Sequence, residues 1–276
     1  IADNKNLKFN QDDVKVKGWS FEARLCAESP TKNFLPSAGR IKELIYPKEN
    51  IRVDSGYQAG GEVSIYYDSL LAKIVSNGSN RKEAINAMQK ALQKVCIEGV
   101  DTNIDFLMDI FKNKHFINGD INTNFIEEIY KNGYKSKTSN KDELNIIAIF
   151  AFCYHINYLI DVNKDIQNIS KQWILYLPHK KINIKIIVMQ SNKLKVFFGE
   201  ILNEIEYNIN YITSLIEINY NKKIYTGRVI ATERFLKVFY NGSNTEVKVL
   251  SLSVDDLYQK LPKEKKIDTT KKVLSP

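Results

Sequence analysis

Phe235-Leu-Lys-Val-Phe-Tyr-Asn-Gly-Ser-Asn-Thr-Glu-Val-Lys-Val-Leu250 is the stretch that decides the fold of the second half of this sequence. Two runs rich in β-branched and aromatic residues, 235–240 and 245–250, flank the dipeptide Asn241-Gly242. Asn-Gly between two such runs is the strongest short-range signal for a β-hairpin, because both residues tolerate positive φ angles. The stretch therefore predicts two antiparallel strands joined by a tight turn.

Similar strand-like segments fill the sequence from Trp173 onward. Besides the two strands of the hairpin, they cover residues 182–189, 193–198, 204–209, 213–218 and 222–231. Regular short strands linked by tight turns predict an antiparallel barrel or sandwich of about eight strands, since a sheet of this size must close or cover its edges.

A long apolar segment, residues 144–160, precedes these strands, and Asn140 with Glu143 forms a capping signal at its start. The segment is short for a membrane span and contains two asparagines and a histidine, so we expect a buried helix and no membrane partner. Residues 132–140 are polar and rich in helix breakers, which predicts a linker.

The first half alternates short strands and helices. Residues 18–28 alternate with a period of two, which predicts a strand with Trp19, Phe21, Ala23, Leu25 and Ala27 on one side. Residues 40–46 predict a second strand, and residues 63–67 and 69–75 a further pair. A helix capped by Asn80 and Glu83 and stopped by Gly99 follows, then helices at 102–112 and 124–130.

The composition describes a folded protein: 276 residues, 43% hydrophobic and 26% charged, with a net charge of +8. The lysines are dispersed except at 260–272, which predicts a solvated linker at 262–276. Cys26, Cys96 and Cys153 have no metal-ligand spacing and predict small core residues without a metal site. Asp255-Asp256 lies in a polar segment, which predicts that both carboxylates are solvated.

Several motifs in the first half occur together in one order. They are Gly18-Trp-Ser-Phe-Glu-Ala-Arg-Leu-Cys-Ala-Glu28, Phe34-Leu-Pro-Ser-Ala-Gly-Arg40, Ile51-Arg-Val-Asp-Ser55, Tyr66-Tyr-Asp-Ser69 with Lys73, Glu98-Gly-Val-Asp-Thr-Asn-Ile104 and Asn118-Gly-Asp-Ile-Asn-Thr-Asn-Phe125. The series resembles the C-terminal part of the biotin carboxylase domain in the alpha subunits of biotin-dependent acyl-CoA carboxylases. Ser64-Ile65 before Tyr66 is most similar to the propionyl-CoA enzymes. The methylcrotonyl-CoA enzymes share part of the pattern and remain an alternative, as do other acyl-CoA carboxylases.

The resemblance implies an α+β fold in four parts. Residues 1–131 would be the C-terminal subdomain of a biotin carboxylase, 132–140 a linker, 141–261 a helix with an antiparallel β-barrel that docks onto a carboxyltransferase beta subunit, and 262–276 a linker toward a biotinyl domain. The chain ends at Ser275-Pro276, where the family has a biotinyl domain, and the family's ATP-grasp core is not found in it.

The same resemblance implies one catalytic and cofactor-binding residue, Arg52. In the family an arginine at this position lies beside the ureido ring of biotin, and a guanidinium suits an oxygen that gains negative charge because it is planar, permanently cationic and rich in donors. Read without the family, Arg52 is an ordinary surface arginine paired with Asp54 or Glu49. The motif residues Glu22, Arg24, Tyr66, Tyr67, Asp68 and Lys73 are expected to have structural roles in the sheet and its turns.

Cofactors, partners and compartment follow from the family as well. The full enzyme would use ATP, Mg and biotin carried on another domain. It would carboxylate biotin and pass the carboxyl group to propionyl-CoA, giving methylmalonyl-CoA. The 276-residue chain by itself is expected to bind none of these cofactors and to be inactive. Its partners would be the beta subunit and the biotinyl and ATP-grasp parts of its own subunit, in the cytoplasm of a bacterium or the mitochondrial matrix of a eukaryote.

A basic β-barrel is also typical of a non-enzymatic binding module for nucleic acid or another anion. Aromatic residues on the predicted strands could stack on bases: Phe197, Phe198, Tyr211, Tyr220, Phe235 and Tyr240. Aromatic residues at strand spacing lie more often in a core or an interface. We therefore expect no nucleic-acid partner, and we keep the binding module as the alternative from a different class.

Overall fold

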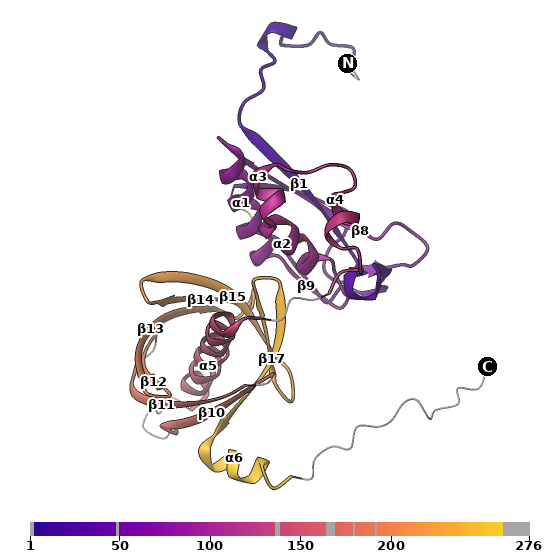
Figure 1. The fold of residues 1–276 in the computed structure, drawn as a ribbon. Helices are drawn as coiled ribbons and strands as arrows, with labels where there is room; N and C mark the ends of the chain where they lie inside the picture. The colour runs from indigo at the N-terminus through magenta and orange to yellow at the C-terminus, as the bar shows by residue number, and fades with distance from the viewer. Residues whose placement is uncertain are drawn as a thin grey trace, which may run out of the picture.

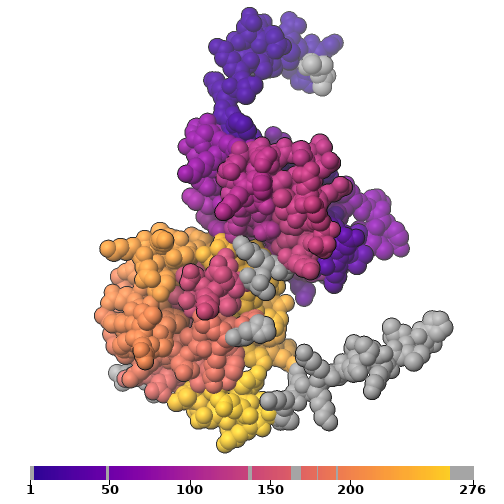
Figure 2. Space-filling model, in the orientation of Figure 1, coloured from indigo at the N-terminus to yellow at the C-terminus, as the bar shows by residue number. Residues whose placement is uncertain are grey.

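The computed structural model describes residues 3–47, 50–135, 139–163, 169–178, 180–190 and 192–261. Each half has its own large hydrophobic core, and a smaller cluster of Phe106, Ile110, Phe125 and Tyr134 lies beside the first. The halves appear as two rounded bodies in Figure 2, and their elements are labelled in Figure 1. The predicted fold class, sheet and helices followed by a helix with an eight-stranded barrel, is confirmed.

The first half is built on a three-stranded antiparallel sheet in the order β1-β8-β6, with β1 at Trp19–Cys26, β8 at Leu70–Gly78 and β6 at Ile51–Ser55. Ala23, Leu25 and Ile74 on one face are buried. Helix α1 (Arg81–Lys94) packs against this face and beside α2 (Ile104–Lys112) in Figure 1. The Asn80 side chain accepts a hydrogen bond from the backbone N of Glu83 at 3.0 Å, so the predicted cap is confirmed.

The other elements of this half are short. They are the 3₁₀ turns η1 (Gln11–Asp13) and η2 (Pro30–Lys32), the strands β2 (Glu28–Ser29), β3 (Leu35–Pro36), β4 (Gly39–Arg40), β5 (Glu43–Ile45), β7 (Glu62–Val63) and β9 (Cys96–Glu98), and the helices α2 (Ile104–Lys112), α3 (Lys114–Asn118) and α4 (Phe125–Ile129). The strands form three two-stranded pairs, β2-β3, β4-β7 and β5-β9.

Of the two strands predicted at 63–67 and 69–75, the second corresponds to β8, whereas the first is wrong beyond Val63, where β7 (Glu62–Val63) ends. β7 pairs with β4, and β8 is the central strand between β1 and β6. Side chains of the intervening loop bond to its own backbone: the hydroxyl of Ser64 accepts from the N of Tyr66 at 3.2 Å, and the carboxylate of Asp68 from the N of Leu70 at 2.9 Å. The residue types of this segment favour a strand. The local bonds prevent it, because they occupy backbone N–H groups that a strand would use to pair with its neighbour.

Gly99 does not end helix α1, which was the second incorrect prediction. The helix ends at Lys94, and the chain forms β9 before it reaches Gly99. A Cβ on Gly99 would lie 2.1 Å from the backbone O of Arg40, and the residue has a φ of +108°. The glycine is therefore required by the close approach of two backbone segments.

The second half is a closed antiparallel barrel. Its strands are β10 (Gln172–Leu177), β11 (Lys180–Gln190), β12 (Lys193–Phe198), β13 (Ile201–Asn210), β14 (Leu215–Tyr220), β15 (Lys223–Ala231), β16 (Leu236–Tyr240) and β17 (Ser243–Ser251). Each strand pairs with the next, and β17 pairs with β10. Asn241 and Gly242 have φ angles of +55° and +79° and connect β16 to β17, as predicted. Closure leaves no free edge.

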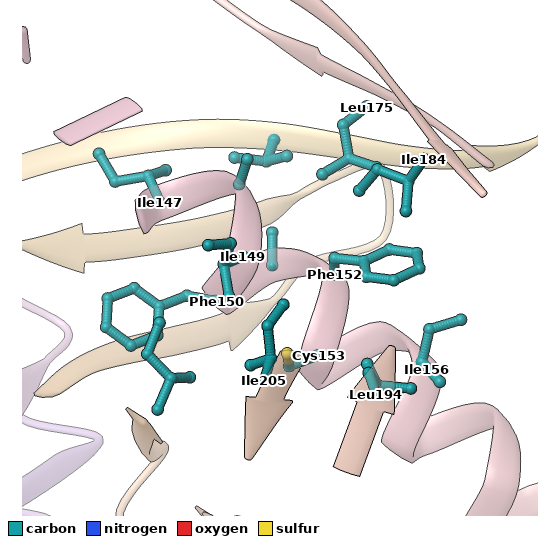
Figure 3. Packing of buried hydrophobic residues seen from close by; sticks show 14 of the residues in the cluster. Ile147, Ile149, Phe150, Phe152, Cys153, Ile156, Leu175, Ile184, Leu194 and Ile205 are labelled. Atoms are coloured by element: carbon teal, nitrogen blue, oxygen red, sulfur yellow. The ribbon is translucent and has the colours of Figure 1, made fainter. Parts of the chain in front are cut away.

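Helix α5 (Lys141–Asn163) lies inside the barrel. Its apolar side chains point outward in several directions and meet side chains of the strands. Figure 3 shows Phe150, Phe152 and Ile156 among Leu175, Ile184, Leu194 and Ile205. Residues 141–162 are also long and apolar enough to cross a membrane, judged by length and composition alone. Half of the most apolar part of this helix is buried inside the protein. A helix that is apolar all round is stable here because the strands surround it.

The barrel is followed by helix α6 (Leu252–Tyr258), which was not predicted. Asp255 on this helix is only 1% exposed, so the prediction of a solvated Asp255 is wrong. Its carboxylate accepts hydrogen bonds from the hydroxyl of Tyr176 at 2.5 Å and from Lys181 Nζ at 3.1 Å. The predicted linker at 262–276 lies outside the described residues, and the four domain boundaries stay a prediction.

The contact between helix and barrel gives a first prediction. A Cβ on Gly227 of β15 would lie 2.7 Å from the ring of Phe150. Gly227→Ala should therefore lower the free energy of unfolding by about 1–3 kcal/mol, the usual cost of overpacking. Adding Phe150→Leu should recover part of this loss, because it removes the ring that the new methyl group meets. Denaturant unfolding of the 276-residue chain measures both.

Gly56→Ala is the matched control, since its Cβ would meet nothing closer than 4.0 Å, the backbone O of Leu71. Equal unfolding midpoints for the Gly227→Ala and Gly56→Ala variants would contradict the packing described above.

Candidate functional site

The first-half sheet has one buried and one exposed face. The exposed face, here called the polar face, consists of Glu22, Arg24, Arg52, Asp54 and Lys73, with Val75 among them. Two rows follow from the strand register: Glu22, Val75 and Arg52 lie side by side on β1, β8 and β6, and Arg24, Lys73 and Asp54 form the next row. Helix α1 covers the opposite face, so among the residues of this half that the structure describes, the polar face carries charges that no element covers.

Arg52 projects from the edge strand β6 on the polar face, and its side chain is 75% exposed. Its Nε donates a hydrogen bond of 2.9 Å to Oδ1 of Asp54. This bond, with the negative charge of Asp54 and a smaller contribution from Glu22, raises the pKa of the Arg52 guanidinium above its ordinary value. The group is therefore a fixed positive charge at any physiological pH.

The Arg52–Asp54 pair is the one that a surface arginine would be expected to form. Neither the cavity between the two halves nor the cavity next to α6 is lined by Arg52. The site is accordingly an open charged surface in the part of the chain that the structure describes. A ligand would reach Arg52 from the solvent side of the sheet.

The motif residues around Arg52 lie at the surface of the sheet and of the loop before β8, and their expected structural role stays a prediction. Arg24 Nη2 lies 3.8 Å from the Asp68 carboxylate, which connects the polar face to the loop between β7 and β8. Tyr66 and Tyr67 of this loop are 87% and 80% exposed. The sequence did not show that these residues belong to one surface. The available signal was the i, i+2 spacing of charges in both Glu22-Ala-Arg24 and Arg52-Val-Asp54.

A second charged cluster lies where the two halves meet. Arg228 of β15 is 7% exposed, and its Nη2 donates 3.2 Å to the backbone O of Lys94, the last residue of α1. A guanidinium at a helix C-terminus is favoured by the partial negative charge there. Arg228 Nε finds no hydrogen-bond partner among the described residues. Burial lowers the pKa of Arg228, and the charges of nearby Glu43 and Glu98 oppose this shift.

Glu43, Cys96 and Glu98 bring three potential metal-ligand atoms within 4.8 Å of one another. Burial, the largest cause, raises the pKa of the Cys96 thiol to about 11. A protonated thiol is a poor metal ligand, and the Arg228 guanidinium nearby disfavours a second cation. The cluster is better explained as the acidic partner of Arg228 across the contact between the two halves.

Three of the six aromatic residues considered for base stacking pack against the barrel core, whereas Tyr211 is 43% exposed. The three are Phe198, Tyr220 and Tyr240. The Tyr220 hydroxyl donates to Asn203 at 2.8 Å, and the Tyr240 ring lies 5.5 Å from that of Phe150. These side chains stabilise the barrel around α5, which gives no support to the interpretation as a nucleic-acid binding module.

Comparison with known proteins agrees with the motifs of the first half. Residues 22–128 match the family model of the biotin carboxylase C-terminal domain. The propionyl-CoA carboxylase alpha chain of Caenorhabditis elegans, named mitochondrial, is 32% identical over 98% of this chain and 41% of its own length. That of Sus scrofa is 40% identical over 55% of this chain and 21% of its own length. The solved biotin carboxylase domain of the Hydrogenobacter thermophilus 2-oxoglutarate carboxylase is 38% identical, with a TM-score of 0.45, over 46% of this chain and 28% of that chain.

Residues 22–128 therefore belong to the biotin carboxylase C-terminal domain family. Over nearly its whole length the chain is a relative of propionyl-CoA carboxylase alpha chains, which confirms the resemblance seen in the motifs. The chain spans about two fifths of the length of the C. elegans relative, with 41% covered.

The exposure of the Arg52–Asp54 pair gives a second prediction. Arg52→Ala should leave the unfolding temperature of the 276-residue chain unchanged, because exposed ion pairs contribute little to stability. Arg81→Ala is the contrasting variant: the Arg81 guanidinium lies 4.9 Å from the ring centre of Phe21 and donates 3.2 Å to the backbone O of Ile117. Its loss should cost about 1 kcal/mol or more. A thermal melt in which Arg52→Ala is the more damaging change would show that Arg52 has a structural role.

Proposed function

We propose that this chain is part of the alpha subunit of a biotin-dependent acyl-CoA carboxylase of the propionyl-CoA type. The complete enzyme would carboxylate biotin with ATP and bicarbonate and transfer the carboxyl group to propionyl-CoA, giving methylmalonyl-CoA. Similarity along nearly the whole chain to propionyl-CoA carboxylase alpha chains supports this, since it includes the barrel as well as the first half. The mitochondrial names of animal relatives support the mitochondrial matrix if the source is eukaryotic.

The observation that carries the proposal is the placement of Arg52. A fixed cation stands on an open sheet face within the residues that match the biotin carboxylase C-terminal domain. Among the described residues, Asp54 is the recorded hydrogen-bond partner of the guanidinium, through Nε. The outer edge of the guanidinium, formed by the two terminal nitrogens, therefore offers a pair of N–H donors. These features fit a ligand that presents an oxygen atom carrying negative charge.

Biotin, when bound, supplies a ureido nitrogen that takes up the carboxyl group, and loss of its proton puts negative charge on the ureido oxygen. Arg52 would hold donors toward that oxygen. A preorganised donor of this kind contributes about 10²–10³ in rate, because it is already oriented when the charge develops. ATP and Mg would be bound by other parts of the subunit, so the prediction stands that the isolated chain is inactive.

The second half would dock the subunit onto the carboxyltransferase beta subunit. The barrel has its own core around α5, so it can present an outer surface without depending on the first half for its fold. Several large apolar side chains are exposed on this surface, among them Ile187, Val188, Ile201 and Leu202. Exposed apolar side chains of this kind are typical of protein contacts.

The role of Arg52 gives a third prediction. In the full-length enzyme, Arg52→Ala should lower the rate of biotin carboxylation by about 10²–10³ while ATP binding is retained. Arg52→Lys should recover only a small part of the rate, because an ammonium group keeps the charge but lacks the planar pair of donors. Biotin-dependent ATP cleavage measures the rate, and nucleotide titration measures ATP binding. Normal turnover of Arg52→Ala would refute the assignment.

The role of the barrel gives a fourth prediction. The 276-residue chain immobilised on a resin should retain the carboxyltransferase beta subunit, and added oligonucleotide should not compete. A nucleic-acid binding module would instead bind oligonucleotide with an affinity that falls steeply as salt is raised. Such binding, with no retention of the beta subunit, would favour the binding module over the carboxylase subunit.

A further inference from the structure

We propose that Asp54 is a positioning residue for Arg52: its carboxylate holds the guanidinium in one orientation before a ligand arrives. The inference rests on the proposed function of Arg52 and names a second residue on which that function depends. Its basis is the hydrogen bond of 2.9 Å from Arg52 Nε to Asp54 Oδ1 and the strand register that fixes the two residues.

The backbone of β6 already fixes where both side chains start. Arg52 is opposite Val75 and Asp54 is opposite Lys73 on β8, and residues two apart on a strand project from the same face. β6 is an edge strand, so its side chains have a neighbouring strand on one side only. The remaining freedom lies in the long Arg52 side chain, which is 75% exposed and has no packing to hold it.

A hydrogen bond at Nε restricts that freedom in a specific way. The guanidinium is planar, so a bond at Nε ties one edge of it to Asp54 and leaves the outer edge, formed by the two terminal nitrogens, with one N–H donor from each. An arginine that must be ordered on ligand binding loses conformational entropy at that step, and a side chain already held in place loses less. Asp54 thereby turns a flexible surface cation into an oriented pair of donors.

Asp54 also balances charge on the polar face. It stands beside Arg52 along β6 and directly opposite Lys73, and the next residue of that row is Arg24. Three cations on one face repel each other, and repulsion alone would direct the Arg52 side chain away from the sheet. The carboxylate offsets this repulsion. Its 45% exposure shows that this role needs no burial of the pair.

The test uses the full-length enzyme with free biotin as the substrate. Asp54→Asn keeps the size of the side chain and removes the charge that holds Nε. We expect kcat for biotin-dependent ATP cleavage to fall by up to about 10²-fold, the loss typical of a misplaced catalytic group. KM for ATP should not change, because no nucleotide contact is altered. Asp54→Glu, which retains a carboxylate, should recover most of the rate.

A double-mutant cycle separates positioning from a general structural effect. Asp54→Asn should cost much less in an Arg52→Lys background, because lysine has no Nε–H fork for Asp54 to orient. Asp120→Asn is the matched control: Asp120 is an exposed carboxylate of the same half that bonds His115 Nδ1 at 2.9 Å, far from the polar face in the sequence. This variant should have normal kcat. The unfolding temperatures of all variants should match that of the parent enzyme.

Two results would overturn the positioning role. One is normal kcat in Asp54→Asn when Arg52→Ala is inactive, which leaves the proposed function intact. The other is an equal loss from Asp54→Asn with either arginine or lysine at position 52, which would mean that the carboxylate does not act through the guanidinium. Normal activity in Arg52→Ala, by contrast, would refute the proposed function itself.

Discussion

The alternation of side chains along an antiparallel strand determines both what is buried and what is exposed in this chain. In the first half, α1 covers one face of β1, β8 and β6, and most residues on that face, such as Ala23, Leu25 and Ile74, are apolar. The same alternation sends Arg52 and Asp54 to the opposite face. In the second half it directs one set of side chains inward onto α5. A shift of one residue in any of these strands would exchange the two sets and remove both the core and the polar face.

The barrel could be predicted because its signals are local. Asn241-Gly242 specifies a hairpin by its backbone preferences, and the runs of β-branched residues give the strands to within a few residues. The prediction of 193–198 matches β12 at both ends. The loop at residues 64–69 could not be predicted from such local signals. Residue types alone do not show that Asp68 bonds to the backbone of its own loop. Asp255 is a similar case, since Tyr176 and Lys181, which compensate its burial, are far away in sequence.

The sequence was sufficient to propose Arg52 as a candidate site residue, but it did not show which other residues lie on the same surface. Arg52 came from a motif, and residue chemistry by itself favours an ordinary surface pair with Asp54, which is the contact that the structure shows. The two descriptions are compatible. What the sequence lacked was the order of the strands. With β8 between β1 and β6, Glu22, Arg24 and Lys73 are placed in rows with Arg52 and Asp54, and separate motifs become neighbours.

The contact between the halves raises the question of how docking of one half would affect the other. Arg228 reaches from the barrel to the last carbonyl of α1, and α1 is the helix that packs beneath the polar face. A buried guanidinium is expensive to move away from the negative end of a helix and from nearby carboxylates unless water replaces them. The buried Arg228 guanidinium therefore opposes separation of the two halves. The barrel also meets α2, because Lys112 Nζ donates 2.9 Å to the backbone O of Asn241 in the turn between β16 and β17. A load on the barrel would therefore reach the first half through both α1 and α2, the helices that pack beneath the sheet carrying Arg52.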